Sequence, residues 1–207
     1  MRLAAVVFLA LLLLPVVAIA GPLEDGEKAF ERHDYQTALK LWQPLADQGD
    51  ARAENNIALM YLGGAGVTRD YAEAMKWYLK AARAGNAAGQ FMVGQMNERG
   101  QGVPRSLPEM MKWYRRAAEQ GFSPAQYKLG WAYERGWGGV TQDYAEAYFW
   151  DLLSQKSDSE TLHRPDYGDA AAHLTTEQRA AVAKRVKEWK PSPAQPPAPA
   201  TTPDKGP

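Results

Sequence analysis

The chain has 207 residues, of which 45% are hydrophobic and 23% charged, and its 24 basic side chains balance its 24 acidic ones. This length and apolar content suffice for one domain with a buried core. Nucleic-acid-binding domains carry a basic excess or a Lys/Arg stripe, so the balanced charge argues against a nucleic-acid partner. The absence of cysteine excludes disulfides and lipid attachment at a lipobox.

Residues 1–20 have the pattern of a signal peptide. Arg2 precedes an unbroken apolar run, residues 3–19, and Ala18 and Ala20 are the small residues that a signal peptidase requires. Cleavage is expected after Ala20, with an uncleaved membrane anchor as the alternative, because the run is about long enough to span a bilayer. We expect a periplasmic or secreted protein of a Gram-negative bacterium, with no stable membrane span after cleavage.

One glycine-rich stretch occurs three times, which predicts a repeat architecture. The segment "YLGGAGVTRDYAEAMKWYLKAA" at 61–82 returns as "NERGQGVPRSLPEMMKWYRRAA" at 97–118 and as "YERGWGGVTQDYAEAYFWDLLS" at 133–154. A phosphate-binding loop is normally built once and needs a Lys-Ser/Thr that these stretches lack, so we interpret them as turns between helices. The expected units are a partial repeat at 22–50 and full repeats at 51–86, 87–122 and 123–158.

Each unit is predicted to form two helices joined by the glycine turn. In the first full unit, Ala53, Ile57 and Tyr61 fall on one face of a helix. A second helix is expected to begin at Asp70, because Glu73 follows at capping-box spacing. The same signal recurs at Ser106 with Glu109, Asp143 with Glu146, and Ser123 with Gln126.

The repeated pattern, A-x3-[LIV]-[GA]-x2-Y-x2-G-x-G-V-x2-D-x2-[KE]-A-x2-W-Y-x-K-A-A-x2-G, closely resembles the Sel-one-like repeat, a relative of the tetratricopeptide repeat. The resemblance covers residues 51–153 strongly and 22–50 more weakly. It implies an all-α fold, a right-handed α-solenoid of stacked helix–turn–helix repeats. The third unit departs from the pattern, since Phe149-Trp150-Asp151-Leu152-Leu153 replaces the W-Y-x-K-A-A ending.

Residues 159–190 are expected to cap the array. Thr175 with Gln178 forms another capping-box signal before an apolar stripe that includes Val182, Val186 and Trp189. A basic amphipathic helix on a membrane surface is the alternative for this segment. The last 17 residues, 191–207, hold seven of the 14 prolines and no large apolar side chain, so we predict a disordered tail.

No catalytic, cofactor-binding or metal-binding residues are predicted. The three histidines, His33, His163 and His173, lack zinc-site spacing, and no serine stands in a G-x-S-x-G or S-x-x-K context. His163 lies near Asp166 and Asp169, but we interpret this segment as a polar connector between the array and its cap.

Family resemblance implies a concave groove lined by the first helix of each unit. By analogy with the tetratricopeptide groove, ten residues are expected to face it: Asn55, Leu59, Phe91, Gln95, Glu98, Arg99, Tyr127, Trp131, Glu134 and Arg135. This mixture of aromatic, amide and charged side chains suits a peptide-binding surface. Packing between repeats is an equally weighted interpretation for Phe91 and Tyr127.

These features predict a monomeric, non-enzymatic exported scaffold or adaptor that binds a partner protein or peptide. One alternative is an enzyme that binds or hydrolyses β-lactams, as is associated with some cysteine-rich relatives. This chain lacks their cysteines and an identifiable nucleophile. Another alternative is a binder of cell-wall glycan or peptide that uses Trp131 and Trp137.

Overall fold

The structure, a computed structural model, describes residues 21–157 and 169–193, and these ranges hold nine α-helices, one 3-10 helix and no strand. The elements are α1 (Pro22–Glu31), α2 (Tyr35–Asp47), α3 (Ala51–Gly63), α4 (Tyr71–Arg83), α5 (Ala87–Arg99), α6 (Leu107–Glu119), α7 (Ser123–Arg135), α8 (Tyr144–Ser157), η1 (Ala170–His173) and α9 (Thr176–Glu188). The predicted all-α class is confirmed. The predicted signal peptide lies outside the described residues.

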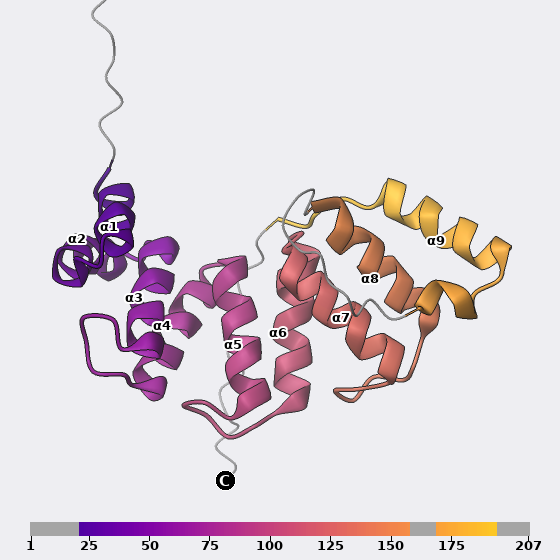
Figure 1. The fold of residues 1–207 in the computed structure, drawn as a ribbon, viewed down its shortest axis with the longest axis horizontal. Coiled ribbons are helices and arrows are strands. Elements are labelled where there is room, and N and C mark those ends of the chain that lie inside the picture. The colour runs from indigo at the N-terminus through magenta and orange to yellow at the C-terminus, as the bar shows by residue number, and fades with distance from the viewer. Residues whose placement is uncertain (1–20, 158–168, 194–207) are drawn as a thin grey trace, which may run out of the picture.

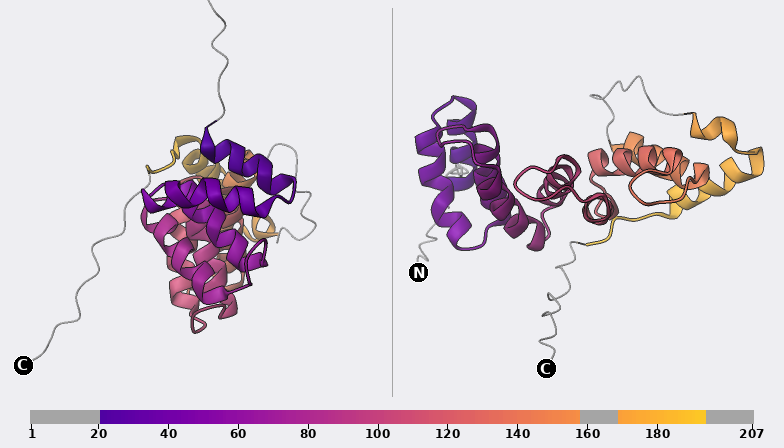
Figure 2. Two further views of the ribbon diagram at one scale, coloured as in Figure 1. Left: turned by 90° about the vertical axis from the view of Figure 1, so that its left-hand side faces the viewer. Right: turned by 90° about the horizontal axis from the view of Figure 1, so that it is seen from below.

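The helices stack in chain order as four hairpins, α1/α2, α3/α4, α5/α6 and α7/α8 (Figure 1). Each helix packs mainly on the one before it and the one after it, and the view from below shows the same order along the long axis (Figure 2). Contacts restricted to neighbours are the mark of a solenoid. Among the described helices, none combines the length and the apolar character needed to cross a bilayer.

Within the first three hairpins, a small residue of the first helix lies against a large aromatic side chain of the second. A Cβ added to Gly26 would collide with the Trp42 indole, and one added to Gly94 would collide with the Tyr114 ring. Ala58 and Tyr78 hold the same positions in the hairpin between these two and lie in one buried cluster. Because glycine or alanine allows the ring to approach the backbone, the two helices pack closely.

The glycine turns also join one unit to the next. Gly64, Gly100 and Gly136 end the first helices in the left-handed conformation, which glycine adopts without a steric penalty. Two residues further on, Gly102 has φ +71°, and its Cα faces the Tyr71 carbonyl at the start of α4. The turn of one unit therefore rests on the second helix of the preceding unit.

Replacing Gly102 by alanine is expected to lower the free energy of unfolding by about 2–4 kcal/mol. A left-handed residue with a Cβ costs about 1–2 kcal/mol, and the clash with the Tyr71 carbonyl adds an overpacking cost of about 1–3 kcal/mol. Two controls separate these causes in urea unfolding. Gly49 has φ +85° and nothing near the position of an added Cβ, so Gly49→Ala should show the conformational cost alone. Gly63 lies in the last turn of α3 and also has open space around it, so Gly63→Ala should be neutral or slightly stabilising.

The last helix, α9, covers α8 at the end of the stack farthest from α1 (Figure 1), which confirms the predicted capping helix. Val182 lies in the same buried cluster as Phe149, and Val186 and Trp189 pack against that cluster. Arg185 pairs with Glu146 of α8 at 2.8 Å. Apolar side chains that the fourth hairpin, α7/α8, would otherwise expose are thereby buried.

The chain beyond α9 returns to the end of α6. The Ser192 amide donates a hydrogen bond to the Glu119 carbonyl at 2.8 Å. The predicted disordered tail therefore differs from the structure at its first three residues, 191–193, because this hydrogen bond ties them to the body of the protein. Residues 194–207 lie outside the described residues, as do residues 159–168 of the predicted cap.

The capping signals are realised in three ways. At Thr175 and Gln178 the reciprocal capping box forms as predicted. Asp70 accepts from the backbone of its helix, but Glu73 pairs with Lys76 at 2.8 Å instead of closing the box. The prediction that Ser123 is a cap is wrong. Helix α7 already includes this residue, and its buried hydroxyl donates to the Ser154 carbonyl at 3.0 Å, which ties α7 to α8.

Candidate functional site

The candidate surface is the row of first helices α1, α3, α5 and α7, which we call the first-helix face. Its equivalent positions follow from the small residues Gly26, Ala58, Gly94 and Gly130. The residue after each is Glu27, Leu59, Gln95 and Trp131, and the residue five positions after each is Glu31, Gly63, Arg99 and Arg135. The positions that pack between helices recur from unit to unit, whereas these outer positions change in charge and size.

The N-terminal end of this face is hollowed between α1 and α3. A cavity of about 200 Å³ is lined by Glu27, Phe30, Glu31, Trp42, Asn56 and Leu59. Leu59, a predicted site residue, is 42% exposed, and among the described residues it is the one large hydrophobic side chain that is open to solvent to this degree. The neighbouring Asn55 is half-buried, and its Oδ1 has no hydrogen-bond partner within the described residues.

In the middle of the face, some of the predicted site side chains contact other parts of the protein. The half-buried Phe91 ring lies 5.3 Å from the Tyr114 ring and 5.4 Å from the Phe122 ring, centroid to centroid, so this side chain packs against the core. Glu98 accepts a hydrogen bond from the Tyr114 hydroxyl and lies 3.4 Å from Lys128 of the next unit. Gln95 is half-buried and Arg99 is exposed, so Arg99 is the more accessible of these two.

The C-terminal end of the face carries a group of aromatic and charged side chains from α7 and the turn that follows it. The Trp131 and Trp137 rings lie 5.1 Å apart in an edge-to-face arrangement, and the Arg135 guanidinium lies 4.7 Å from the centroid of the Trp131 ring. Arg135 also pairs with Glu134 at 3.6 Å. Tyr127 is half-buried one turn before Trp131. The structure thus brings Trp131, Glu134 and Arg135 into one cluster.

A buried carboxyl lies beneath this cluster. Asp151 of α8 occupies the position that Trp42, Tyr78 and Tyr114 hold in the other units, and it is only 7% exposed. Its carboxylate faces Gly130 and receives no hydrogen bond from the described residues. Burial, helped by the negative charge of Glu134, raises the pKa of Asp151 from 3.8 to about 7.

Sequence reasoning missed the contribution of α1 to this face. Glu27, Phe30 and Glu31 line the cavity, yet the ten predicted residues begin at Asn55. The connection between α1 and α2 is four residues shorter than the one between α3 and α4, so the 36-residue spacing does not align α1 with α3. The pairing of a small residue with a large aromatic one, Gly26 with Trp42, is the signal that reveals the correct alignment.

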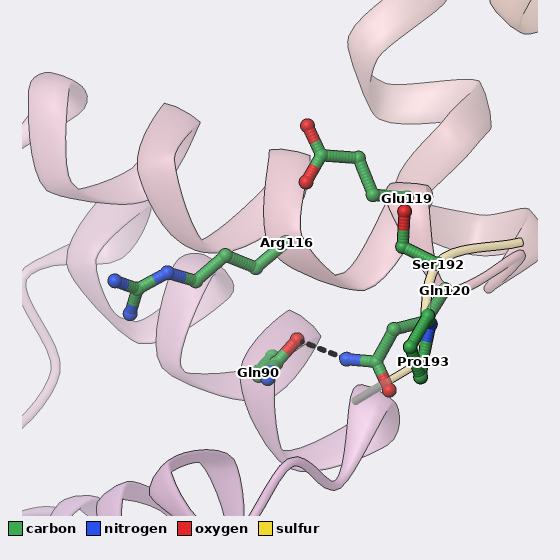
Figure 3. A pocket seen from close by; sticks show the side chains of 6 residues that line it. All are labelled: Gln90, Arg116, Glu119, Gln120, Ser192 and Pro193. Carbon is green, nitrogen blue, oxygen red and sulfur yellow. Dashed lines mark hydrogen bonds between the residues drawn. The ribbon is translucent and has the colours of Figure 1, made fainter. Parts of the chain in front are cut away.

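A second depression lies beside the ends of α5 and α6, where the returning chain crosses (Figure 3). Gln90, Arg116, Glu119, Gln120, Ser192 and Pro193 line it. Its volume is only about 10 Å³, and the Gln120 amide already donates to the Gln90 carbonyl oxygen at 2.7 Å. A space of this size holds one water molecule, so the depression is not a ligand site.

In the described ranges, no group of three or more His, Asp or Glu side chains is placed to hold a metal ion. His33 and His173 each pack beside a tyrosine ring, Tyr35 and Tyr144 respectively. His163 and Asp166, considered above as a connector, lie outside the described residues.

The four helix pairs correspond to the repeats of a known protein family. A model of the Sel1 repeat matches residues 21–50, 51–86, 87–122 and 123–150, which together are more than half of the chain. The chain belongs to the Sel1 repeat family. Sel1 repeat proteins generally mediate protein–protein interactions and are typically non-catalytic scaffolds. No curated protein matches the chain.

Two solved Sel1-type structures resemble this one. A Sel1 repeat protein from Oxalobacter formigenes is 29% identical, with a TM-score of 0.62 over 79% of this chain and 60% of that one. The c5321 protein, a protective antigen present in uropathogenic Escherichia coli strains, is 23% identical, with a TM-score of 0.50 over 84% of this chain and 45% of that one, and shows the fold alone. The chain thus spans 60% of the length of the first of these proteins and 45% of the second.

Proposed function

We propose that this protein is a non-enzymatic scaffold that binds a partner protein or peptide along the first-helix face. The observation that carries the proposal is the cavity of about 200 Å³ between α1 and α3, beside the exposed Leu59. An apolar hollow with a few polar groups around it is the usual form of a binding site for a small group. It lies on the same row of helices as the side chains that vary between units.

The proposed mechanism is preorganisation. Contacts within the protein hold several side chains of the face in place before a partner arrives, such as Glu98 between Tyr114 and Lys128, and Trp131 between Trp137 and Arg135. These side chains of the protein then lose less conformational entropy when a partner binds than the side chains of a flexible surface would. The stacked hairpins supply the rigid support.

We propose further that the protein acts as an exported monomer in the periplasm or outside the cell. The support is the signal-peptide pattern of residues 1–20, with Ala18 and Ala20 before the expected cut. The glycan alternative has less support, because the Trp131 ring is already in contact with the Arg135 guanidinium and with the Trp137 ring. A sugar platform needs an open aromatic face.

Capture of a partner from an envelope extract is expected to fail when Trp131 and Arg135 are both replaced by alanine. Aromatic and arginine side chains dominate binding energies, and losing two at one site lowers affinity by about 30-fold or more. A matched control replaces Lys76 and Lys112, exposed on the second helices α4 and α6, by alanine. If both double variants capture the same partners as the wild type, the first-helix face is not the binding surface. In a separate assay, turnover of a chromogenic β-lactam by the purified protein would support an enzyme instead.

A further inference from the structure

The cavity between α1 and α3 has the size of one amino-acid side chain. Its volume of about 200 Å³ lies below the range of about 300–1,000 Å³ that is typical of pockets for drug-sized ligands. It is comparable with an engineered cavity of about 150 Å³ that binds benzene. A single leucine-sized or phenylalanine-sized group therefore fills it.

The walls of the cavity are apolar. The Phe30 and Trp42 rings lie 5.7 Å apart, centroid to centroid, and Leu59 stands at the mouth. Trp42 is only 2% exposed, and its indole N–H already donates to the Leu23 carbonyl at 3.1 Å. Trp42 thus has no free donor to offer, and burying an apolar group against these rings is favourable.

The rim of the cavity is acidic. Glu27 and Glu31 lie one turn apart on α1, where like charges repel each other. Arg52 pairs with Glu27 at 3.0 Å, whereas Glu31 forms no ion pair with any described residue. At the position equivalent to Glu31, the units of α5 and α7 carry Arg99 and Arg135. The N-terminal end of the face is therefore the end that favours a cation.

Asn56 also lines the cavity, but its Nδ2 is closed off from solvent. A ligand in the cavity therefore meets no accessible side-chain amide donor there. Polar recognition falls to the acidic rim.

We infer that this cavity anchors the bound peptide by one leucine-like or phenylalanine-like side chain, with a lysine or arginine next to it in the peptide. The apolar side chain fills the space beside Phe30 and Trp42, and the neighbouring cation lies against Glu31. The inference rests on the proposed function, because it names the chemistry of the partner that the first-helix face binds.

The test is an NMR titration of the ¹⁵N-labelled protein that follows the Trp42 indole and Asn56 amide signals. Three capped tetrapeptides serve as probes: Gly-Leu-Arg-Gly, Gly-Leu-Glu-Gly and Gly-Ala-Arg-Gly. We expect the first to shift both signals and to bind at least about tenfold more tightly than either of the others, since each lacks one recognised group. Equal binding of the Leu-Glu peptide, equal binding of the Ala-Arg peptide, or no shift with any probe would overturn the inference.

Two variants tie the binding to named side chains. Glu31→Lys and Leu59→Asp, both at exposed positions, are expected to lose the Leu-Arg selectivity. The control Glu188→Lys, at an exposed position of α9 far along the chain from the cavity, should keep it. Partner capture separates this inference from the proposed function. If capture is lost when Trp131 and Arg135 are replaced but not when the cavity is altered, the face binds its partner without this anchor, and the inference fails. If the tetrapeptide binds but none of these variants changes capture, the anchor stands and the proposed scaffold surface fails.

Discussion

Replacing Asp151 by asparagine is expected to raise the free energy of unfolding at pH 8 by about 2–4 kcal/mol. The carboxylate lies in the hairpin core, where it receives no hydrogen bond from the described residues, and burial raises its pKa from 3.8 to about 7. A shift of about three units corresponds to about 4 kcal/mol, which is an upper value because the surroundings relax around a charge. Asparagine has a similar shape and no charge to desolvate.

The effect has a defined dependence on pH. Below about pH 4 Asp151 is protonated in both the folded and the unfolded chain, so it leaves stability unchanged. Between about pH 4 and 7 the folded chain keeps a proton that the unfolded chain has released, and the free energy of unfolding falls as the pH rises. Above about pH 7 the full loss is present. The gain from Asp151→Asn should therefore be near zero at pH 4 and largest at pH 8.

Urea unfolding of both proteins at pH 4, 6 and 8 measures this difference, because all other titrating groups are common to the two chains. Asp25→Asn is a suitable control, since Asp25 is about half exposed on α1 and forms only a surface pair with Lys28. That change should alter stability by less than about 1 kcal/mol at every pH. A gain from Asp151→Asn that is the same at pH 4 and pH 8 would show that the folded state does not hold this carboxyl protonated.

The fold could be predicted from sequence because the constraints on a solenoid recur in every unit. Gly64, Gly100 and Gly136 each end a first helix in the left-handed conformation, and the aromatic residues Tyr78 and Tyr114 each fill the same space. When one backbone requirement is met repeatedly at a fixed spacing, the pattern predicts the helix order and the class of fold.

The site was harder to predict because binding surfaces lie where units differ. The shorter connection between α1 and α2 concealed Glu27 and Glu31, since a fixed spacing of 36 residues misaligns them. Spacing also could not separate a residue that faces outward from one that packs inward. Phe91 shares its position with Asn55 and Tyr127, but contacts with Tyr114 and Phe122 turn it toward the core.

The equivalent of Asp151 in the second full unit carries the other large expected effect. Tyr114→Ala should lower the free energy of unfolding by about 3–5 kcal/mol, because it empties the space between α5 and α6 that the ring fills against Gly94. Tyr114→Phe keeps the ring and removes the hydroxyl that donates to Glu98. Since this bond joins a buried hydroxyl to a carboxylate, its loss should cost about 1.5–3 kcal/mol.

Tyr78→Phe provides the matched comparison for the hydrogen bond. The Tyr78 ring occupies the same place one unit earlier and is equally buried, but its hydroxyl forms no hydrogen bond with the described residues, and the residue equivalent to Glu98 is Leu62. Urea unfolding should therefore show a clear loss for Tyr114→Phe and almost none for Tyr78→Phe. If the two variants lose the same free energy of unfolding, the hydroxyl stabilises the fold equally with and without a carboxylate partner, and the bond to Glu98 contributes nothing of its own. Glu98 would then be available to a partner instead of being held by Tyr114.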